Sequence, residues 1–295
     1  MKYTNNFNLP KEIVHTIVND DYDHPTDEKT IPVHDLIAPT RIAVLSGRHD
    51  DEIIKDVSED IWKLFGQSIH YILSRQKPEG KLIEERIKIQ FKDYVVSGKP
   101  DNFDIESGHL QDYKVTSVWT YIYGSKDGRK EWEDQLNLYA WLLRSAGRVV
   151  KQVSITALLR DWSQRDASKS SSYPQIPLQT LEMPLWSFQE QEKYIEDKIK
   201  LFEQNMPFPD NDLALCTPNE RWASPTTWAV MKEGNKKASK VETTEEEANK
   251  WIQEQGNGKK FSIEVRKGED KRCTRYCNVN RWCNYYKGEY CENRD

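Results

Sequence analysis

Apolar residues recur at helical spacing in three stretches of the chain. In residues 58–75, 131–145 and 185–205 they fall three and four positions apart, as they do along one face of an amphipathic helix. The apolar stripes consist of Ile61, Leu64, Phe65, Ile69, Ile72 and Leu73 in the first stretch, Leu136, Leu142 and Leu143 in the second, and Trp186, Tyr194, Ile195, Ile199 and Phe202 in the third. The pattern predicts three helices, each with one buried face.

Shorter stretches between these helices predict strands. Residues 82–91 alternate between apolar and polar side chains, residues 93–98 and 110–115 are expected to be extended, and residues 153–159 form an apolar run. Glu106-Ser107-Gly108 predicts a hairpin turn, and the Ser-, Lys- and Pro-rich residues 163–177 predict a loop. Helices that alternate with strands predict an α/β fold.

Length and composition indicate one large domain with an appendage. At 295 residues the chain exceeds the usual size of a single domain. We expect an N-terminal helical or extended segment in residues 1–55, the principal core in residues 56–210, and a small Cys-rich module in residues 211–295. Mean hydropathy is −0.85, no apolar run approaches the roughly 20 residues that span a bilayer, and residues 1–10 lack the blocks of a secretion signal. We therefore expect a cytoplasmic protein without a membrane partner.

Two carboxylates and a lysine occur close together in the sequence. Asp101 ends the segment Gly98-Lys99-Pro100-Asp101, and Asp112-Tyr113-Lys114 follows after ten intervening residues. Because side chains alternate along a strand, Asp112 and Lys114 project to the same side if residues 110–115 are extended. The carboxylates could bind Mg²⁺ or Mn²⁺ through oxygen, and the lysine could orient a water molecule or offset charge on a phosphorane. Taken alone, such a pattern also occurs on solvated hairpins.

Two further pairs of residues accompany this motif in order along the chain. Gly66 and His70 lie four apart in the first predicted helix, and Gln135 and Tyr139 lie four apart on one face of the second. His70 falls on or beside the apolar face, where a lone histidine is more often a satisfied core residue than a ligand. As a signature of function, the ordered set of motifs is far more specific than any single motif in it.

Taken together, these motifs resemble the RecB-type branch of the PD-(D/E)XK nucleases, relatives of the RecB and AddAB nuclease domains and of CRISPR-adaptation nucleases. The resemblance covers residues 56–162 and, more loosely, the whole chain, which is similar to phage-encoded members. It implies a restriction-endonuclease-like core with a mixed central sheet flanked by helices. It also implies that the chain acts on DNA.

The resemblance implies roles for individual residues. It implies that the metal ligands are His70, Asp101 and Asp112 together with the backbone carbonyl of Val115. The catalytic lysine would be Lys114, and Gln135 and Tyr139 would be a supporting pair. Asp101 and Asp112 also count as catalytic residues, and the supporting pair would contact the DNA backbone or orient the lysine. Glu84 and Glu85, on the alternating residues 82–91, could reach a second metal or a ligating water. Ordinary solvated strand carboxylates fit them better, so we do not assign them to the site.

The charge balance argues against a protein that coats nucleic acid uniformly. The chain has 43 basic and 48 acidic residues, although residues 231–295 hold 15 basic against 12 acidic residues. Beyond the apolar residues 153–159, Arg160, Arg165 and Lys169 are candidates for a strip that tracks phosphates. Each of them could equally be a solvated surface charge.

All five cysteines lie in the last 80 residues of the chain: Cys216, Cys273, Cys277, Cys283 and Cys291. Clustered thiols in a reducing compartment indicate a metal site more readily than disulfides. The spacing of Cys277 and Cys283 is similar to the end of the iron–sulfur motif in the nuclease relatives, which implies a [4Fe–4S] cluster on Cys216, Cys273, Cys277 and Cys283 rather than a set with Cys291. The sequence departs from that motif in two ways, because no cysteine precedes His70 and three residues rather than two separate Cys273 from Cys277. Zn²⁺ bound by the same four thiolates is the alternative.

These observations predict a Mg²⁺- or Mn²⁺-dependent DNA exonuclease that acts on strand ends and favours single-stranded or resected DNA. It would serve phage recombination, replication or end processing in a bacterial host cell, where a recombination or replication protein is a further candidate partner. Two alternatives stay open: a noncatalytic DNA-binding or host-interaction module on the same fold, and a structure-specific endonuclease. The intact set of two acids, a lysine and a histidine argues against the noncatalytic alternative.

Overall fold

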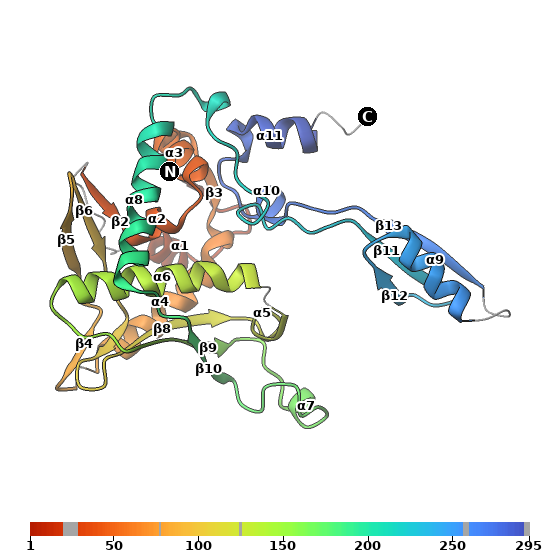
Figure 1. Cartoon of the computed structure of the whole chain (residues 1–295), viewed down its shortest axis with the longest axis horizontal. Coiled ribbons are helices and arrows are strands. Elements are labelled where there is room, and N and C mark those ends of the chain that lie inside the picture. The colour runs from red at the N-terminus through yellow and green to blue at the C-terminus, as the bar shows by residue number, and fades with distance from the viewer. Residues whose placement is uncertain (20–28, 77, 124–125, 256–259, 292–295) are drawn as a thin grey trace. The chain divides into compact units, whose positions relative to one another are not determined.

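The computed structural model describes residues 1–19, 29–76, 78–123, 126–255 and 260–291, and it divides into two compact units, Met1–Ala214 and Leu215–Asp295 (Figure 1). Both units combine helices with strands, so the expectation of an α/β fold is confirmed. Within the described ranges, no helix combines the length and the apolar character needed to cross a bilayer.

The first unit holds most of the regular structure. Its helices are α1 (Lys11–Val18), α2 (Val33–Ile37), α3 (Thr40–Arg48), α4 (Ile61–Ser74), α5 (Val118–Tyr123), α6 (Lys126–Ser145), α7 (Gln164–Ala167) and α8 (Phe188–Asn205), with single 3-10 turns at Asp50–Glu52, Val57–Asp60 and Asp210–Asp212. Its strands are β1 (Lys2–Thr4), β2 (Thr30–Pro32), β3 (Ile54–Asp56), β4 (Lys81–Ile83), β5 (Ile87–Phe91), β6 (Tyr94–Gly98), β7 (Asn102–Asp104), β8 (His109–Thr116), β9 (Gln152–Leu159) and β10 (Leu178–Met183). The predicted helices and the predicted strand at residues 110–115 are all present, with boundaries shifted by a few residues.

A five-stranded mixed sheet forms the centre of this unit, in the order β10-β9-β8-β7-β4. β8 and β9 run parallel, and the other neighbouring strands run antiparallel. The parallel pair is joined through α6, as a crossover connection requires. β10 is an additional edge strand that the sequence pattern did not predict.

The predicted strand at residues 82–91 is wrong in one respect, because the structure breaks it into β4 and β5, which belong to different sheets. The break occurs at Glu84, whose φ is 53°. A positive φ is incompatible with an extended strand and is uncommon for a residue other than glycine. After the break, β5 pairs with β6, and β6 pairs with β2, in a second, three-stranded sheet.

α6 is the central helix of the unit, and Figure 1 shows it beside β8 of the main sheet. It contacts β8 and β9 of that sheet, β5 and β6 of the second sheet, and the helices α2 and α8. Every residue from Leu136 to Leu143 is consequently buried. The sequence predicted a helix with one buried face, but a helix covered on several sides is buried all round.

α4 differs from α6 in that none of its residues is fully buried. Of the six apolar positions that were predicted to form a buried face, Phe65 and Ile72 are 51% and 57% exposed, and the other four are half-buried. His70 is among the half-buried positions, whereas Trp62, Lys63, Ser68 and Tyr71 are exposed as well. The helix therefore carries His70 at its inner side and an apolar surface at its outer side.

The N-terminal residues fold as part of the first unit. α3 contacts α8, and the end of α3 is joined to the turn at Asp210 by two ion pairs. Arg48 Nη1 lies 2.8 Å from Asp210 Oδ1, and His49 Nε2 lies 2.6 Å from Asp210 Oδ2. Hydrogen bonds with Glu52 and Asp210 raise the pKa of His49, and those with His49 and Arg48 lower the pKa of Asp210.

The second unit contains a small sheet covered by a helix. Its strands β11 (Thr227–Lys232), β12 (Ala238–Glu242) and β13 (Phe261–Arg266) pair antiparallel in the order β12-β11-β13, and α9 (Glu245–Glu254) lies across them (Figure 1). Trp251 of α9 packs edge-on against Phe261, with ring centroids 5.4 Å apart. The helices α10 (Lys271–Arg275) and α11 (Asn284–Tyr286), a 3-10 turn at Asn280–Trp282 and a π-helical turn at Lys287–Cys291 follow.

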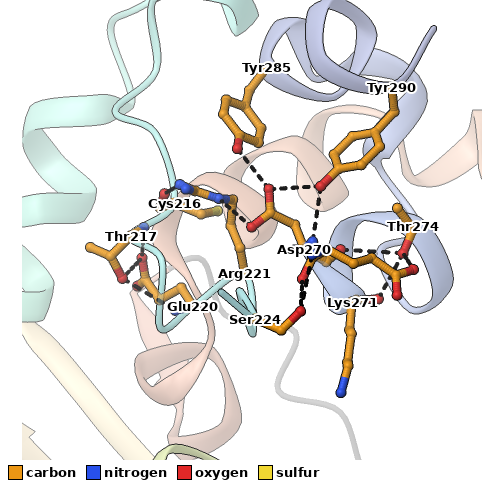
Figure 2. A network of polar contacts seen from close by, with 11 residues as sticks. Cys216, Thr217, Glu220, Arg221, Ser224, Asp270, Lys271, Thr274, Tyr285 and Tyr290 are labelled. Atoms are coloured by element: carbon orange, nitrogen blue, oxygen red, sulfur yellow. Dashed lines mark hydrogen bonds and ion pairs between the residues drawn. The ribbon is translucent and has the colours of Figure 1, made fainter. Parts of the chain in front are cut away.

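A buried carboxylate, Asp270, joins the two ends of this second unit. Figure 2 shows Arg221 on one side of the carboxylate and the hydroxyls of Tyr285 and Tyr290 on the other. Arg221 Nε lies 3.2 Å from Asp270 Oδ1, and the two tyrosines donate hydrogen bonds of 2.7 and 3.0 Å to Oδ2. Because Arg221 also donates to the carbonyl of Cys216, this network connects the segment of the first cysteine with the segment of the other four.

Candidate metal centre and catalytic residues

The hairpin of β7 and β8 brings the two aspartates of the motif together. The register pairs Asn102 with Gln111, so Asp101, which precedes Asn102, falls next to Asp112, which follows Gln111. Asp101 Oδ2 accepts a hydrogen bond of 2.7 Å from the backbone N–H of Tyr113. The turn that was predicted at Glu106-Ser107-Gly108 is present, and Gly108 adopts the positive φ of 72° that favours glycine there.

His70 reaches the hairpin from α4. Its Nδ1 lies 3.4 Å from Asp101 Oδ1 and 2.9 Å from Glu84 Oε1. The ligand atoms of these three residues all lie within 4.8 Å of one another, and among the described residues they form the one such group of histidine, cysteine and acidic side chains. The predicted meeting of an imidazole and a carboxylate is therefore present, but Glu84 occupies the third place in the group.

Glu84 is the residue that the sequence interpretation missed. We expected a solvated strand carboxylate, but the left-handed backbone at Glu84 turns this residue out of the strand path. Its N–H donates to the carbonyls of Pro100 and Asp101, at 3.1 and 3.2 Å, and its Oε2 lies 2.9 Å from Lys99 Nζ. The backbone of Glu84 is thus tied to the turn that carries Asp101, and no periodic pattern in the sequence signals such a bend.

Asp112 and Lys114 project to the same side of β8, as the alternation predicted. Lys114 Nζ lies 2.6 Å from Asp112 Oδ2 and donates a hydrogen bond of 2.8 Å to Gln135 Oε1. Gln135 Nε2 in turn donates to the hydroxyl of Tyr139 at 3.1 Å. The four residues form a continuous polar chain from β8 to α6, in which Asp112 is buried and Lys114 is only partly covered.

Burial and neighbouring charges set the protonation of this site. Burial raises the pKa of Asp112 to about 7, against the opposing charge of Lys114 and with the added repulsion of Asp101. Burial lowers the pKa of His70, but hydrogen bonds and charges from Asp101 and Glu84 outweigh it and raise this pKa to about 10. Burial likewise opposes ionisation of Glu84, yet its hydrogen bonds with His70 and Lys99 lower its pKa. The site therefore brings together three carboxylates, and at Asp112 burial disfavours the charged form that a bound cation would stabilise.

The residues present fit a hard divalent cation. Asp112 Oδ1 is buried without a hydrogen-bond partner, which is costly for a carboxylate unless a cation or donor binds it. The neighbouring carboxylates of Glu84 and Asp101 supply oxygen, the donor that Mg²⁺ and Mn²⁺ prefer, and His70 supplies nitrogen. Val115 follows Lys114 in β8 and is half-buried, and its carbonyl stays a predicted ligand.

Comparison with known proteins decides the family. The family model described as the PD-(D/E)XK nuclease superfamily matches residues 12–284. The chain belongs to the PD-(D/E)XK nuclease superfamily. A solved structure described as "Crystal structure of SSO0001" is similar at 16% sequence identity and a TM-score of 0.46, over 72% of this chain and 88% of that chain. No curated protein matches the sequence significantly.

Membership of the PD-(D/E)XK superfamily brings a reaction class with it. Its members hydrolyse phosphodiester bonds of nucleic acids with a divalent metal, Mg²⁺ or Mn²⁺. The group of His70, Glu84 and Asp101 is a candidate acidic metal site of this kind. The restriction-endonuclease-like fold expected from the sequence agrees with the mixed sheets flanked by helices.

The cysteines lie in the second unit. Cys273 is in α10, Cys277 and Cys283 follow it, and Cys291 is exposed at the end of the π-helical turn. Burial raises the pKa of the Cys216 thiol to about 12, and Glu220 and the charges of Cys273, Cys277 and Cys283 add to this shift. Within the described ranges, no three of the four sulfurs lie within 4.8 Å of one another.

Proposed function

We propose that this PD-(D/E)XK protein is a DNA exonuclease of the RecB-type branch, which uses Mg²⁺ or Mn²⁺ at the hairpin of β7 and β8. The observation that carries the proposal is the position of Lys114. Its ammonium is held between Asp112 and Gln135, beside the group of His70, Glu84 and Asp101. A noncatalytic binding module has no need to keep a partly covered lysine against a buried carboxylate.

The proposed metal ligands are His70, Asp101 and Asp112, with the carbonyl of Val115, and we add Glu84 to them because of its place in the structure. A bound Mg²⁺ or Mn²⁺ would polarise the scissile phosphate and lower the pKa of a coordinated water molecule. The tie from Asp101 to the N–H of Tyr113 fixes that carboxylate in place before metal binds. Because a ligating imidazole must be neutral, His70 has to release its proton on binding.

Lys114 supplies the positive charge that the reaction needs outside the metal shell. Its hydrogen bond with Gln135 fixes the ammonium near Asp112, where it can stabilise the charge that develops on the phosphate. Tyr139 orients Gln135 from the next turn of α6. In this proposal Gln135 and Tyr139 act by positioning Lys114.

Action at strand ends, in phage recombination, replication or end processing, is supported by the resemblance of the ordered motifs to the RecB-type branch. Digestion of end-labelled linear and covalently closed circular DNA with Mg²⁺, Mn²⁺ or chelator tests it, with Asp112→Asn and Lys114→Ala as comparison variants. We expect metal-dependent loss of linear DNA only, and both variants should lose cleavage while they keep most DNA binding. Cutting of closed circles would identify an endonuclease, and binding without cleavage by the wild type would identify a noncatalytic module.

We also propose that Cys216, Cys273, Cys277 and Cys283 hold a [4Fe–4S] cluster. The charges of Cys273, Cys277 and Cys283 contribute to the raised pKa of Cys216, and the segments that carry these thiols are joined through Arg221 and Asp270, which supports a shared metal. Iron and acid-labile sulfide in the purified protein, with visible absorbance that bleaches on reduction, are the expected result. A colourless protein that contains one zinc ion would show that zinc, and not an iron–sulfur cluster, occupies this site, and it would leave the nuclease proposal intact.

A further inference from the structure

The exposed side of α4 carries two large aromatic side chains close to each other. Trp62 and Phe65 are one helical turn apart, more than half of each side chain is exposed, and their ring centroids are 5.5 Å apart. α4 contains no acidic residue, although acidic residues outnumber basic ones in the chain as a whole. The helix itself therefore presents aromatic side chains and no acidic one on this surface, and the exposed carboxylate that comes next in the sequence is Glu59, in the 3-10 turn before α4.

A cation covers one of these rings. The guanidinium carbon of Arg160 lies 4.4 Å from the centroid of the Trp62 ring, and Arg160 itself is exposed. Trp62, Phe65 and Arg160 are called the α4 platform below. An arginine that stacks on an exposed indole offers a flat cationic surface beside an aromatic one, a combination that suits a base together with its phosphate.

The α4 platform adjoins the candidate catalytic strand. The N–H of Arg160 donates a hydrogen bond of 2.9 Å to the carbonyl of Thr116, which is two residues beyond Lys114 in β8. On α4, Trp62 and His70 are eight positions apart, which corresponds to about 12 Å along the helix axis. A strand whose phosphate lies at the metal group can therefore extend onto the platform.

We propose that the α4 platform is a stacking site for unpaired bases of the strand that is cut. Bases in a duplex are already stacked on one another, so only a single-stranded or frayed segment presents the free base faces that aromatic rings bind. The inference rests on the proposed nuclease function and narrows its substrate to nucleic acid with an unpaired segment next to the scissile phosphate.

The test measures binding in the presence of chelator, so that cleavage plays no part. The wild type and the variant Trp62→Ala/Phe65→Ala are titrated against a fluorescent oligothymidylate and a blunt hairpin duplex. Stacking is worth about 1–3 kcal/mol per base, so the double variant should bind the single strand at least about fivefold more weakly. Its affinity for the duplex should stay within about twofold of the wild type.

Two variants of α4 serve as controls. Tyr71→Ala removes an aromatic side chain that is 67% exposed and lies nine residues from Trp62, on the opposite side of the helix, and it should leave single-strand binding unchanged. Trp62→Phe keeps a ring at the platform and should retain most of the affinity. Because Trp62 and Phe65 are exposed, the double variant should melt close to the wild-type temperature.

The outcomes separate this inference from the proposed function. Unchanged single-strand binding by the double variant would overturn the platform, and so would an equal loss for single strand and duplex. A change in sedimentation with unchanged DNA binding would identify the surface as a protein contact and would also overturn it. If the wild type binds single strands through the platform but cleaves no DNA with Mg²⁺ or Mn²⁺, the nuclease proposal fails while the stacking site stands.

Discussion

Glu84 Oε1 lies 2.9 Å from His70 Nδ1, although the two residues come from different segments and only one of them belongs to the motif that was visible in the sequence. The contact is possible because the chain turns at Glu84 with a φ of 53°. Backbone strain of this kind persists where the surrounding structure determines it, and it concentrates at functional sites. The bend therefore strengthens the assignment of Glu84 to the metal centre.

Replacement of Glu84 tests that assignment directly. Glu84→Gln keeps the shape of the side chain and removes its charge, so the Mn²⁺ concentration that gives half-maximal cleavage should rise about 10- to 100-fold. Glu85→Gln is the matched control, because Glu85 is the neighbouring carboxylate and is exposed. An equal response of the two variants would show that Glu84 has no special place in the site.

The polar chain behind Lys114 predicts a graded effect. Gln135→Ala removes the acceptor that holds a charged group, a bond worth about 1.5–3 kcal/mol, so kcat at saturating metal should fall about 10- to 100-fold. Tyr139→Phe keeps the buried ring and loses only the hydroxyl that Gln135 Nε2 contacts, so its loss should be tenfold or less. A larger loss in Tyr139→Phe than in Gln135→Ala would contradict this order.

Gly98 links the packing of α6 to the site. A Cβ atom at Gly98 would lie 2.5 Å from Leu142 Cδ1 and 2.9 Å from Tyr139 Cε1. Gly98→Ala should therefore lower the free energy of unfolding by about 1–3 kcal/mol, measured by urea denaturation, and should reduce cleavage through displacement of Tyr139. Gly47→Ala, in α3 with open space around the new atom, should raise stability by about 0.5–1 kcal/mol. Equal stability of the two variants would argue against this packing.

The ion pair of His49 and Asp210 makes stability depend on pH. Because the pKa of His49 is raised in the folded state, its contribution is full below the unfolded value of about 6.5 and is lost as pH rises through the folded-state value. The lowered pKa of Asp210 gives a contribution that is lost as pH falls below about 4. The difference in melting temperature between the wild type and His49→Gln should be larger at pH 5.5 than at pH 9. In an Asp210→Asn background that dependence on pH should shrink.

Much of the fold could be predicted because apolar residues recur in the principal helices and strands at the regular spacing of those elements. The 3.6-residue spacing located α4, α6 and α8, and the predicted turn at Glu106-Ser107-Gly108 with the predicted strand at residues 110–115 located the β7–β8 hairpin. Periodicity does not say which sheet a strand joins, so the division of residues 82–91 between two sheets was not predicted. Nor does it say how many sides of a helix are covered, and for this reason α4 and α6 were both given one buried face.

The candidate site was predictable where it rests on alternation and on ordered motifs. Asp101, Asp112, Lys114, His70 and the pair on α6 come close together, and their roles stay predictions. Glu84 was missed because its position depends on a left-handed backbone, which a glutamate does not favour and which no neighbour in the sequence announces. In the second unit, the cysteine spacing gave no sign of the sheet and helix between Cys216 and Cys273.

The chain enters that sheet and helix and leaves them again at the same place in the cysteine-bearing segment. Ser224 N–H donates to the carbonyl of Glu269, Glu269 N–H donates back to Ser224 Oγ, and Ala223 pairs with Asp270. When the two ends of a segment are fixed side by side, its interior can change without moving the chain on either side of it. Relatives could carry a longer, shorter or altogether different insert at this position, and a designer could graft one, without disturbing the spacing of the thiols.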